Sequence, residues 1–166
     1  MPEKELTTDP TGFLELSQEL LERGGRLRFQ AHGRSMHPFI KNGDIIVVEP
    51  KNGRSVNAGD IIFYHRPDGS PTIHRLVKIH SGKDRTVLIT KGDALGSVDP
   101  PVNSEQVLGR VIIIQGNGRT IKLNGWPGGI FGCLIAWTAR GRYPTQGRVV
   151  RYIDTFGRFF LGRRIK

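Results

Sequence analysis

A serine in a loop bounded by glycine and proline offers the clearest chemistry in this sequence. Ser35 lies in the segment GRSMHP (33–38), directly before a second Gly-containing turn, NGD (42–44), and a β-branched run. This setting predicts an irregular loop in which the serine hydroxyl is accessible. A serine hydroxyl at its ordinary pKa is a poor nucleophile, so acyl chemistry at Ser35 would also need a general base within hydrogen-bond reach.

Several further segments follow Ser35, and their order in the sequence helps to interpret this serine. They are GDIIVV (43–48), GDIIFY (59–64), IHRLVKI (73–79), TKGD (90–93) and VLGRV (107–111). Ser-Met-x-Pro followed by Gly-Asp resembles the nucleophile segment of signal peptidases and LexA-type self-cleaving repressors, and Ile-His-Arg resembles their base segment. Bacterial signal peptidases and the repressors have lysine before that arginine. The endoplasmic-reticulum and archaeal signal peptidases have histidine there, as this chain does at His74.

The resemblance implies a Ser-His-Asp site. Ser35 would attack a peptide carbonyl, His74 would take its proton, and a carboxylate would orient the imidazole. Thr-Lys-Gly-Asp with a second aspartate six residues later is similar to the histidine branch, so we favour Asp99 as that carboxylate and keep Asp93 as the alternative. No cofactor is implied. The other histidines have no recognised zinc spacing, so no metal site is expected; they are His32, His37, His65 and His80.

Two features depart from the signal-peptidase pattern. Those enzymes usually have Ser-Gly-Ser at the nucleophile, and the hydroxyl of the first serine helps to stabilise the oxyanion, whereas this chain has Gly33 there. Backbone N–H groups such as that of Ser35 would then bind the oxyanion, and losing one donor costs about 100- to 1,000-fold in rate. The second departure concerns the membrane anchor that signal peptidases usually carry. Residues 1–28 contain neither a signal peptide nor an apolar stretch of roughly 20 residues that could provide it.

The elements expected around these residues are mainly β, because the 22 glycines and 10 prolines suit short strands joined by tight turns. Residues 11–23 predict one short amphipathic helix, and Gly24-Gly25 ends it. Six β-branched runs predict strands; they are 26–33, 44–50, 60–67, 72–80, 85–93 and 106–116. Gly-Asp-Ile-Ile occurs twice, which predicts two similar turns in which Asp44 and Asp60 bind local backbone N–H groups.

The charge of the chain is concentrated at its C-terminal end. The net charge is +10, and residues 119–166 hold ten Lys or Arg against one acid. The apolar residues of 149–160 are spaced as in a basic amphipathic helix, which would either dock on the domain or lie peripherally on an anionic membrane. Nucleic acid is the less favoured partner, although charge alone suits both.

We therefore expect a signal-peptidase/LexA-like β-rich fold in three parts. These are an N-terminal helical segment (1–28), a catalytic domain (29–123) and a basic C-terminal extension (124–166). The predicted function is a serine endopeptidase that processes a precursor or partner peptide, in the cytoplasm or peripherally at a membrane. The alternative is a catalytically weak or inactive module with the same fold, whose basic extension binds membrane, nucleic acid or protein.

Overall fold

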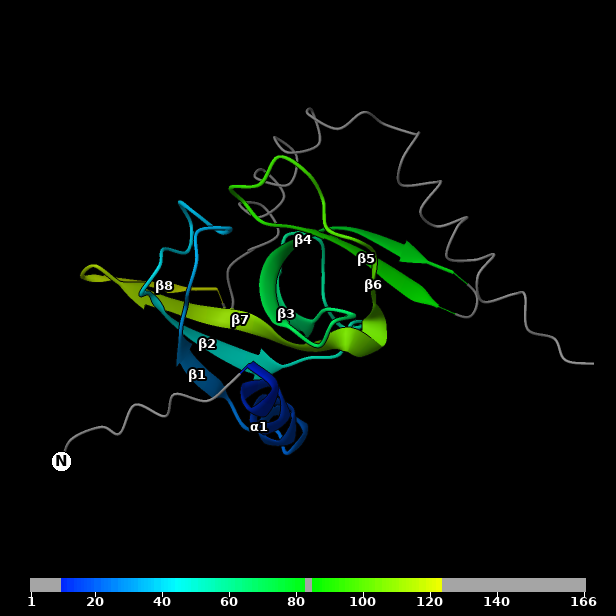
Figure 1. The fold of residues 1–166 in the computed structure, drawn as a ribbon, viewed down its shortest axis with the longest axis horizontal. Helices are drawn as coiled ribbons and strands as arrows, with labels where there is room; N and C mark the ends of the chain where they lie inside the picture. Colours follow the sequence, from blue (N-terminus) through cyan, green and yellow to red (C-terminus); the bar gives the residue numbers. More distant parts are fainter. Residues whose placement is uncertain (1–9, 83–84, 124–166) are drawn as a thin grey trace, which may run out of the picture.

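The computed structural model describes residues 10–82 and 85–123. Within these residues one helix is followed by a series of short strands (Figure 1). The elements are α1 (Pro10–Glu22), β1 (Leu27–Gln30), β2 (Ile45–Pro50), β3 (Ile61–His65), β4 (Pro71–Ser81), β5 (Thr86–Lys91), β6 (Val102–Asn103), the 3₁₀ turn η1 (Ser104–Gln106), β7 (Val107–Gly116) and β8 (Arg119–Lys122). The mainly β prediction is confirmed, as are the N-terminal helix and a strand in each of the six β-branched runs.

All the strand pairs are antiparallel, and together they form one curled sheet. The order is β1-β2-β7-β3-β4-β5-β6, and β8 pairs with β7. The register shifts between Val47 and Val48 on β2, and again between Phe63 and Tyr64 on β3. Such irregularities bend and twist a strand. The half of the sheet that contains β3 and β4 therefore curls over the half that contains β2 and β7 (Figure 1).

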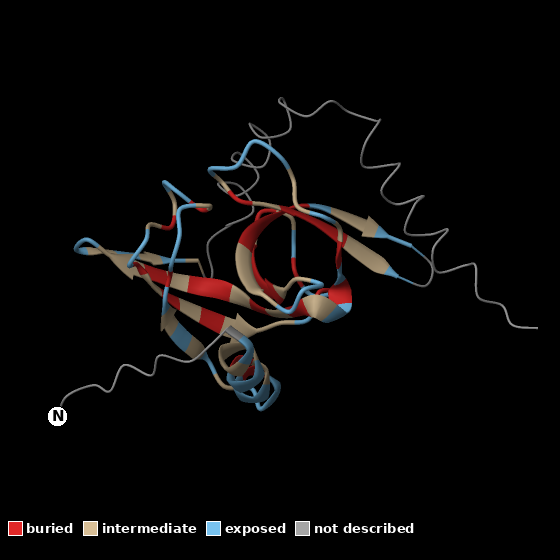
Figure 2. Ribbon diagram, viewed as in Figure 1, coloured by how far each residue is buried: buried red, intermediate tan, exposed pale blue. Residues whose placement is uncertain are grey.

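The two larger hydrophobic clusters of the curled sheet both include residues of β3. Phe63 belongs to the cluster under α1, β1, β2 and β7, whereas its neighbour Ile62 belongs to the cluster with β4 and β5. Buried residues are concentrated in the strands, whereas most of α1 is exposed or half-buried (Figure 2). Phe13 of α1 packs edge-on against Phe29, with ring centroids 5.2 Å apart, which holds the helix on the sheet.

Two strands were not predicted, and one of them had a signal in the sequence. β7 and β8 form a hairpin in which Gly116 pairs with Arg119, so Asn117 and Gly118 make a two-residue turn. Both turn residues have positive φ, 48° and 71°. Asn-Gly between two β-branched runs is a typical sequence for this turn. β6 is only two residues long and has no comparable signal.

No helix among the described residues is long and apolar enough to cross a bilayer. The basic C-terminal extension (124–166) and the amphipathic helix predicted within it lie outside the described residues.

Candidate active site

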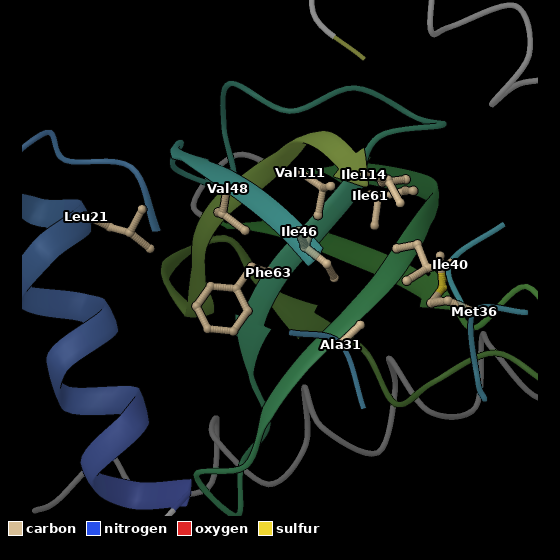
Figure 3. Packing of buried hydrophobic residues seen from close by; sticks show 10 residues of the cluster. All are labelled: Leu21, Ala31, Met36, Ile40, Ile46, Val48, Ile61, Phe63, Val111 and Ile114. Atoms are coloured by element: carbon tan, nitrogen blue, oxygen red, sulfur yellow. The ribbon is translucent and has the colours of Figure 1, made fainter. Parts of the chain in front are cut away.

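Ser35 is held on the loop between β1 and β2. The base of the loop is closed by backbone hydrogen bonds, including one of 2.7 Å from the Ala31 N–H to the Asp44 carbonyl oxygen. Two side chains of the loop, Met36 and Ile40, are buried in the first hydrophobic cluster. Figure 3 shows them at one side of this cluster, with Leu21 of α1 at the other. Ser35 itself is only partly buried, so the core fixes the backbone of this loop and leaves the serine near the surface.

The two Gly-Asp turns have the same geometry. Asp44 Oδ2 accepts a 2.9 Å hydrogen bond from the Lys41 N–H, and Asp60 Oδ2 accepts one of 2.8 Å from the Asn57 N–H. The glycine before each aspartate has a φ in the left-handed region, 90° and 99°, which glycine adopts without strain. The predicted turns are therefore confirmed. One leads the chain out of the Ser35 loop into β2, and the other leads it into β3.

His74 lies on β4, opposite Ile62 of β3, and its side chain is only 2% exposed. Its Nδ1 atom is 2.6 Å from Asp99 Oδ2. Asp99 is on the segment between β5 and β6, where its own N–H donates to the Thr90 carbonyl oxygen at 2.9 Å. This bond fixes the main chain of Asp99 close to the imidazole. Asp99, which we favoured over Asp93, is the aspartate in contact with His74.

Gly92 lies where the Ser35 loop and His74 meet. A Cβ on Gly92 would be 2.6 Å from the backbone oxygen of Ser35 and 3.0 Å from His74 Nε2. The same loop binds Ser35 directly, because the Ala94 N–H donates to the Ser35 carbonyl oxygen at 2.9 Å. The Ser35 backbone and the second imidazole nitrogen therefore border one small space, and a residue without a side chain keeps that space open.

Asp99 is ionised in a largely buried setting. Burial raises the pKa of a carboxyl group, but the hydrogen bond and charge of His74, the hydroxyl of Thr90 and the charge of Arg66 outweigh burial and hold the Asp99 pKa below its ordinary value. The Thr90 hydroxyl is 2.8 Å from Asp99 Oδ2, and an Arg66 nitrogen is 3.6 Å from Oδ1. Burial also raises the pKa of neighbouring Tyr64 to about 12, so this phenol stays protonated at neutral pH.

Asp93 has a different partner. Arg75 binds it through two hydrogen bonds, Nε to Oδ1 at 2.8 Å and Nη2 to Oδ2 at 2.7 Å. The same guanidinium donates to the Gly59 carbonyl oxygen at 3.0 Å and lies 4.8 Å from the ring centroid of Phe39. Arg75 therefore connects the loops of Phe39, Gly59 and Asp93. Arg75 thus binds both a carboxylate and a carbonyl oxygen.

Gly33 has a backbone conformation that favours glycine. Its φ is 95°, and its N–H donates to Asn42 Oδ1 at 2.9 Å. A Cβ there would have no heavy atom within 4 Å, so the backbone angle, and not crowding, disfavours a side chain. Within residues 10–82 and 85–123, the Ser35 N–H donates no hydrogen bond.

The other histidines lie apart from this arrangement. His32 and His37 are exposed, and His65 Nδ1 is 3.3 Å from the Arg66 carbonyl oxygen. Burial, with the nearby Lys78 charge, lowers the pKa of His80. Within residues 10–82 and 85–123, no three His, Cys, Asp or Glu side chains are grouped so that they could hold a metal ion.

The family model described as Peptidase S24-like matches residues 2–112, which is more than half of the chain. This chain belongs to the Peptidase S24-like family. The match runs from before α1 into β7, so it includes Ser35, His74, Asp93 and Asp99.

Curated relatives of this S24-like chain include catalytic subunits of yeast signal peptidase complexes. The subunit of Schizosaccharomyces pombe is 34% identical over 77 residues, covering 36% of this chain and 41% of the relative. That of Clavispora lusitaniae is 37% identical over 60 residues, covering 36% of each. That of Zygosaccharomyces rouxii is 36% identical over 70 residues, covering 41% of each. The chain thus spans less than half of these relatives. The resemblance to the signal-peptidase and LexA-type superfamily, on the endoplasmic-reticulum side, is confirmed.

Sequence reasoning missed several residues around Asp99 in this S24-like chain. Thr90 and Gly92 belong to the TKGD segment, but the motif does not say which side chains they contact. Tyr64 is the last residue of the GDIIFY segment, and nothing in the sequence beyond its β-propensity indicates a role for it. Its hydroxyl nevertheless lies 3.1 Å from Thr90 Oγ1. The strand register could have linked Thr90 with β4, because Thr90 pairs with Leu76, two residues after His74.

Proposed function

We propose that this chain is a serine endopeptidase in which Ser35 is the nucleophile, His74 the general base and Asp99 the carboxylate that orients His74. The contact of 2.6 Å between His74 Nδ1 and Asp99 Oδ2 carries this proposal. It occupies one imidazole nitrogen and leaves Nε2 on the side of Gly92 that also borders the Ser35 backbone. An oriented base next to a serine is the arrangement that nucleophilic acyl transfer needs.

The reaction would proceed through an acyl-enzyme. Ser35 Oγ bonds to the peptide carbonyl carbon while its proton passes to His74 Nε2. The carbonyl oxygen becomes negatively charged, and the Ser35 N–H would donate to it. As the C–N bond breaks, His74 returns the proton to the leaving amine. Water then attacks the ester, with His74 taking and returning a proton once more, and restores Ser35.

The substrate class follows from the family and the relatives. The relatives are named as signal peptidase subunits, which supports a peptide or protein substrate. In signal peptidases small side chains commonly precede the cleaved bond, so we propose the same preference. Asp93 is the less favoured orienting carboxylate, because both of its oxygens bind Arg75.

The alternative function is a binding module with weak or no catalysis. Gly33 is the observation that favours it, since its φ of 95° disfavours the serine that signal peptidases use at this position. Ten basic residues in 119–166 suit an anionic membrane as the partner. Cosedimentation of the full chain with phosphatidylserine vesicles, compared with phosphatidylcholine vesicles and with an oligonucleotide competitor, would measure this binding without reference to catalysis.

Peptide digestion tests the enzymatic proposal. The purified chain is incubated with a peptide library, and cuts are located by mass spectrometry. We expect Ser35→Ala and His74→Ala each to abolish the cuts, because the nucleophile and the base are both required. Ser81→Ala and His80→Ala are matched controls, since both residues are on β4 away from Gly92, and these variants should keep the cuts. Cuts that survive Ser35→Ala would contradict the proposal, and a fully inactive wild-type chain would favour the alternative.

A further inference from the structure

Three donor groups converge on one oxygen of Asp99. Oδ2 lies 2.6 Å from His74 Nδ1, 2.8 Å from Thr90 Oγ1 and 3.3 Å from the Tyr64 hydroxyl. The three donors come from adjacent strands, Tyr64 from β3, His74 from β4 and Thr90 from β5. All three residues are buried. Buried hydroxyl groups need hydrogen-bond partners, and this cluster supplies them.

The available protons determine the direction of these hydrogen bonds. Tyr64 and Thr90 each have one hydroxyl proton. Thr90 donates to Asp99, and the Tyr64 hydroxyl is closer to Thr90 Oγ1, at 3.1 Å, than to Asp99 Oδ2. The single Tyr64 proton can go to either acceptor, and the shorter contact favours the order Tyr64 to Thr90 to Asp99. A hydroxyl that accepts one hydrogen bond becomes a stronger donor in the next, so this chain strengthens the contact with Asp99.

Counting protons also shows which nitrogen of His74 is protonated. A carboxylate accepts hydrogen bonds and donates none, so an ionised Asp99 requires a proton on Nδ1 of His74. The neutral imidazole then has an unprotonated Nε2, which is the nitrogen that faces the space at Gly92. This is the tautomer that can take a proton from a serine.

We propose that Thr90 and Tyr64 are positioning residues, which form a donor chain that holds Asp99 towards His74 and so keeps the base in its Nδ1–H tautomer. The catalytic meaning of this inference rests on the proposed function, whereas the tautomer itself does not. The other charged group that faces Asp99 is Arg66, 3.6 Å from Oδ1 on the opposite side of the carboxylate. Without the Thr90 hydroxyl, the carboxylate would be free to turn from His74 towards Arg66.

Nitrogen NMR of the full chain tests the tautomer without any substrate. With ¹⁵N-labelled histidine, the His74 signals are assigned by their loss in His74→Gln. In the wild type at pH 8 we expect a protonated Nδ1 and an unprotonated Nε2. Thr90→Val removes the hydroxyl with little change of shape and should shift His74 towards a mixture of tautomers, while Thr90→Ser should restore the wild-type signals. Thr86→Val, on the same strand, is the matched control and should leave them unchanged.

Kinetics test the catalytic consequence. We expect Thr90→Val to lower kcat by up to about 100-fold, as misplacement of a catalytic group does, with little change in KM. Tyr64→Phe acts through Thr90 and should cost less, about 2- to 10-fold, the equivalent of one hydrogen bond. The double variant should be no worse than Thr90→Val alone, because the two hydroxyls act in one chain.

These readouts separate a positioning role from a structural one. A purely structural role would lower the folded fraction, measured by thermal unfolding, and leave the His74 tautomer of the folded protein unchanged. That result would overturn the inference, as would a wild-type His74 protonated on Nε2. A chain with the expected tautomer and the expected response to Thr90→Val but with no Ser35-dependent cleavage would support the donor chain and contradict the proposed function alone.

Discussion

Arg75, the residue that follows His74 on β4, forms a buried ion pair with Asp93 through two hydrogen bonds of 2.8 and 2.7 Å. Successive residues of a strand point to opposite faces, so Arg75 and His74 engage different aspartates. Asp93 is bound to Arg75, and Asp99 is bound to His74. The two aspartates therefore make two separate contacts. Asp93 connects loops through Arg75, and Asp99 contacts the imidazole of His74.

Removal of Asp93 should destabilise the protein strongly. Asp93→Ala leaves the Arg75 charge buried without its carboxylate, which typically costs about 3–5 kcal/mol. Urea unfolding would measure this cost. Glu19→Ala is the control, because Glu19 pairs with Arg23 in an exposed i,i+4 ion pair on α1 and should contribute less than about 1 kcal/mol. Equal, small losses in both variants would contradict this role of the Arg75–Asp93 pair.

A methyl group on Gly92 should block the site more than it unfolds the protein. In Gly92→Ala the new Cβ would lie 2.6 Å from the Ser35 backbone oxygen and 3.0 Å from His74 Nε2, so one of these groups must move. We expect a loss of about 100-fold in Ser35-dependent cleavage and about 1–3 kcal/mol of stability. Gly96→Ala on the same loop is the matched control, because its Cβ would meet nothing within 4 Å. Full activity in Gly92→Ala would show that the space is not needed.

The strands and their turns were predictable because their signals are local. Alternation of β-branched residues and the two Gly-Asp turns indicate where strands begin, and Asp44 and Asp60 do bind the backbone of their own turns. The offset of Asp99 from Asp93 likewise pointed to the carboxylate that contacts His74. Each of these predictions depends on residues within a few positions of one another or on an ordered motif.

The contacts that complete the cluster were not predictable, because they depend on how the sheet curls. Tyr64 and Asp99 are 35 residues apart in the sequence, and their contact exists only because β3, β4 and β5 are neighbours. The two-residue strand β6 depends in the same way on its pairing with β5. Two residues carry too little β-propensity to predict a strand, so tertiary packing decides whether β6 forms.

Asp99 should make stability depend on pH in the acid range. Its pKa in the folded protein lies below the ordinary value of 3.8, so folding favours the carboxylate. This contribution is fully present above the ordinary value and is lost as the pH falls through the lowered one. The free energy of unfolding of the wild type should therefore decrease more steeply below about pH 4 than that of Asp99→Asn, which has no carboxyl proton to gain. Parallel curves from urea unfolding between pH 6 and the acid range would contradict this.

A serine at position 33 should not improve catalysis. Gly33 has a φ of 95°, and a residue with a side chain is strained there, at a cost of about 1–3 kcal/mol. Gly33→Ser should therefore lose stability in urea unfolding without a gain in Ser35-dependent cleavage. Gly33→Ala is the matched control, since it has the same backbone strain and no hydroxyl. If Gly33→Ser cleaved more than about 10-fold faster than Gly33→Ala, a side-chain donor would contribute to oxyanion binding, and the backbone N–H of Ser35 would not suffice.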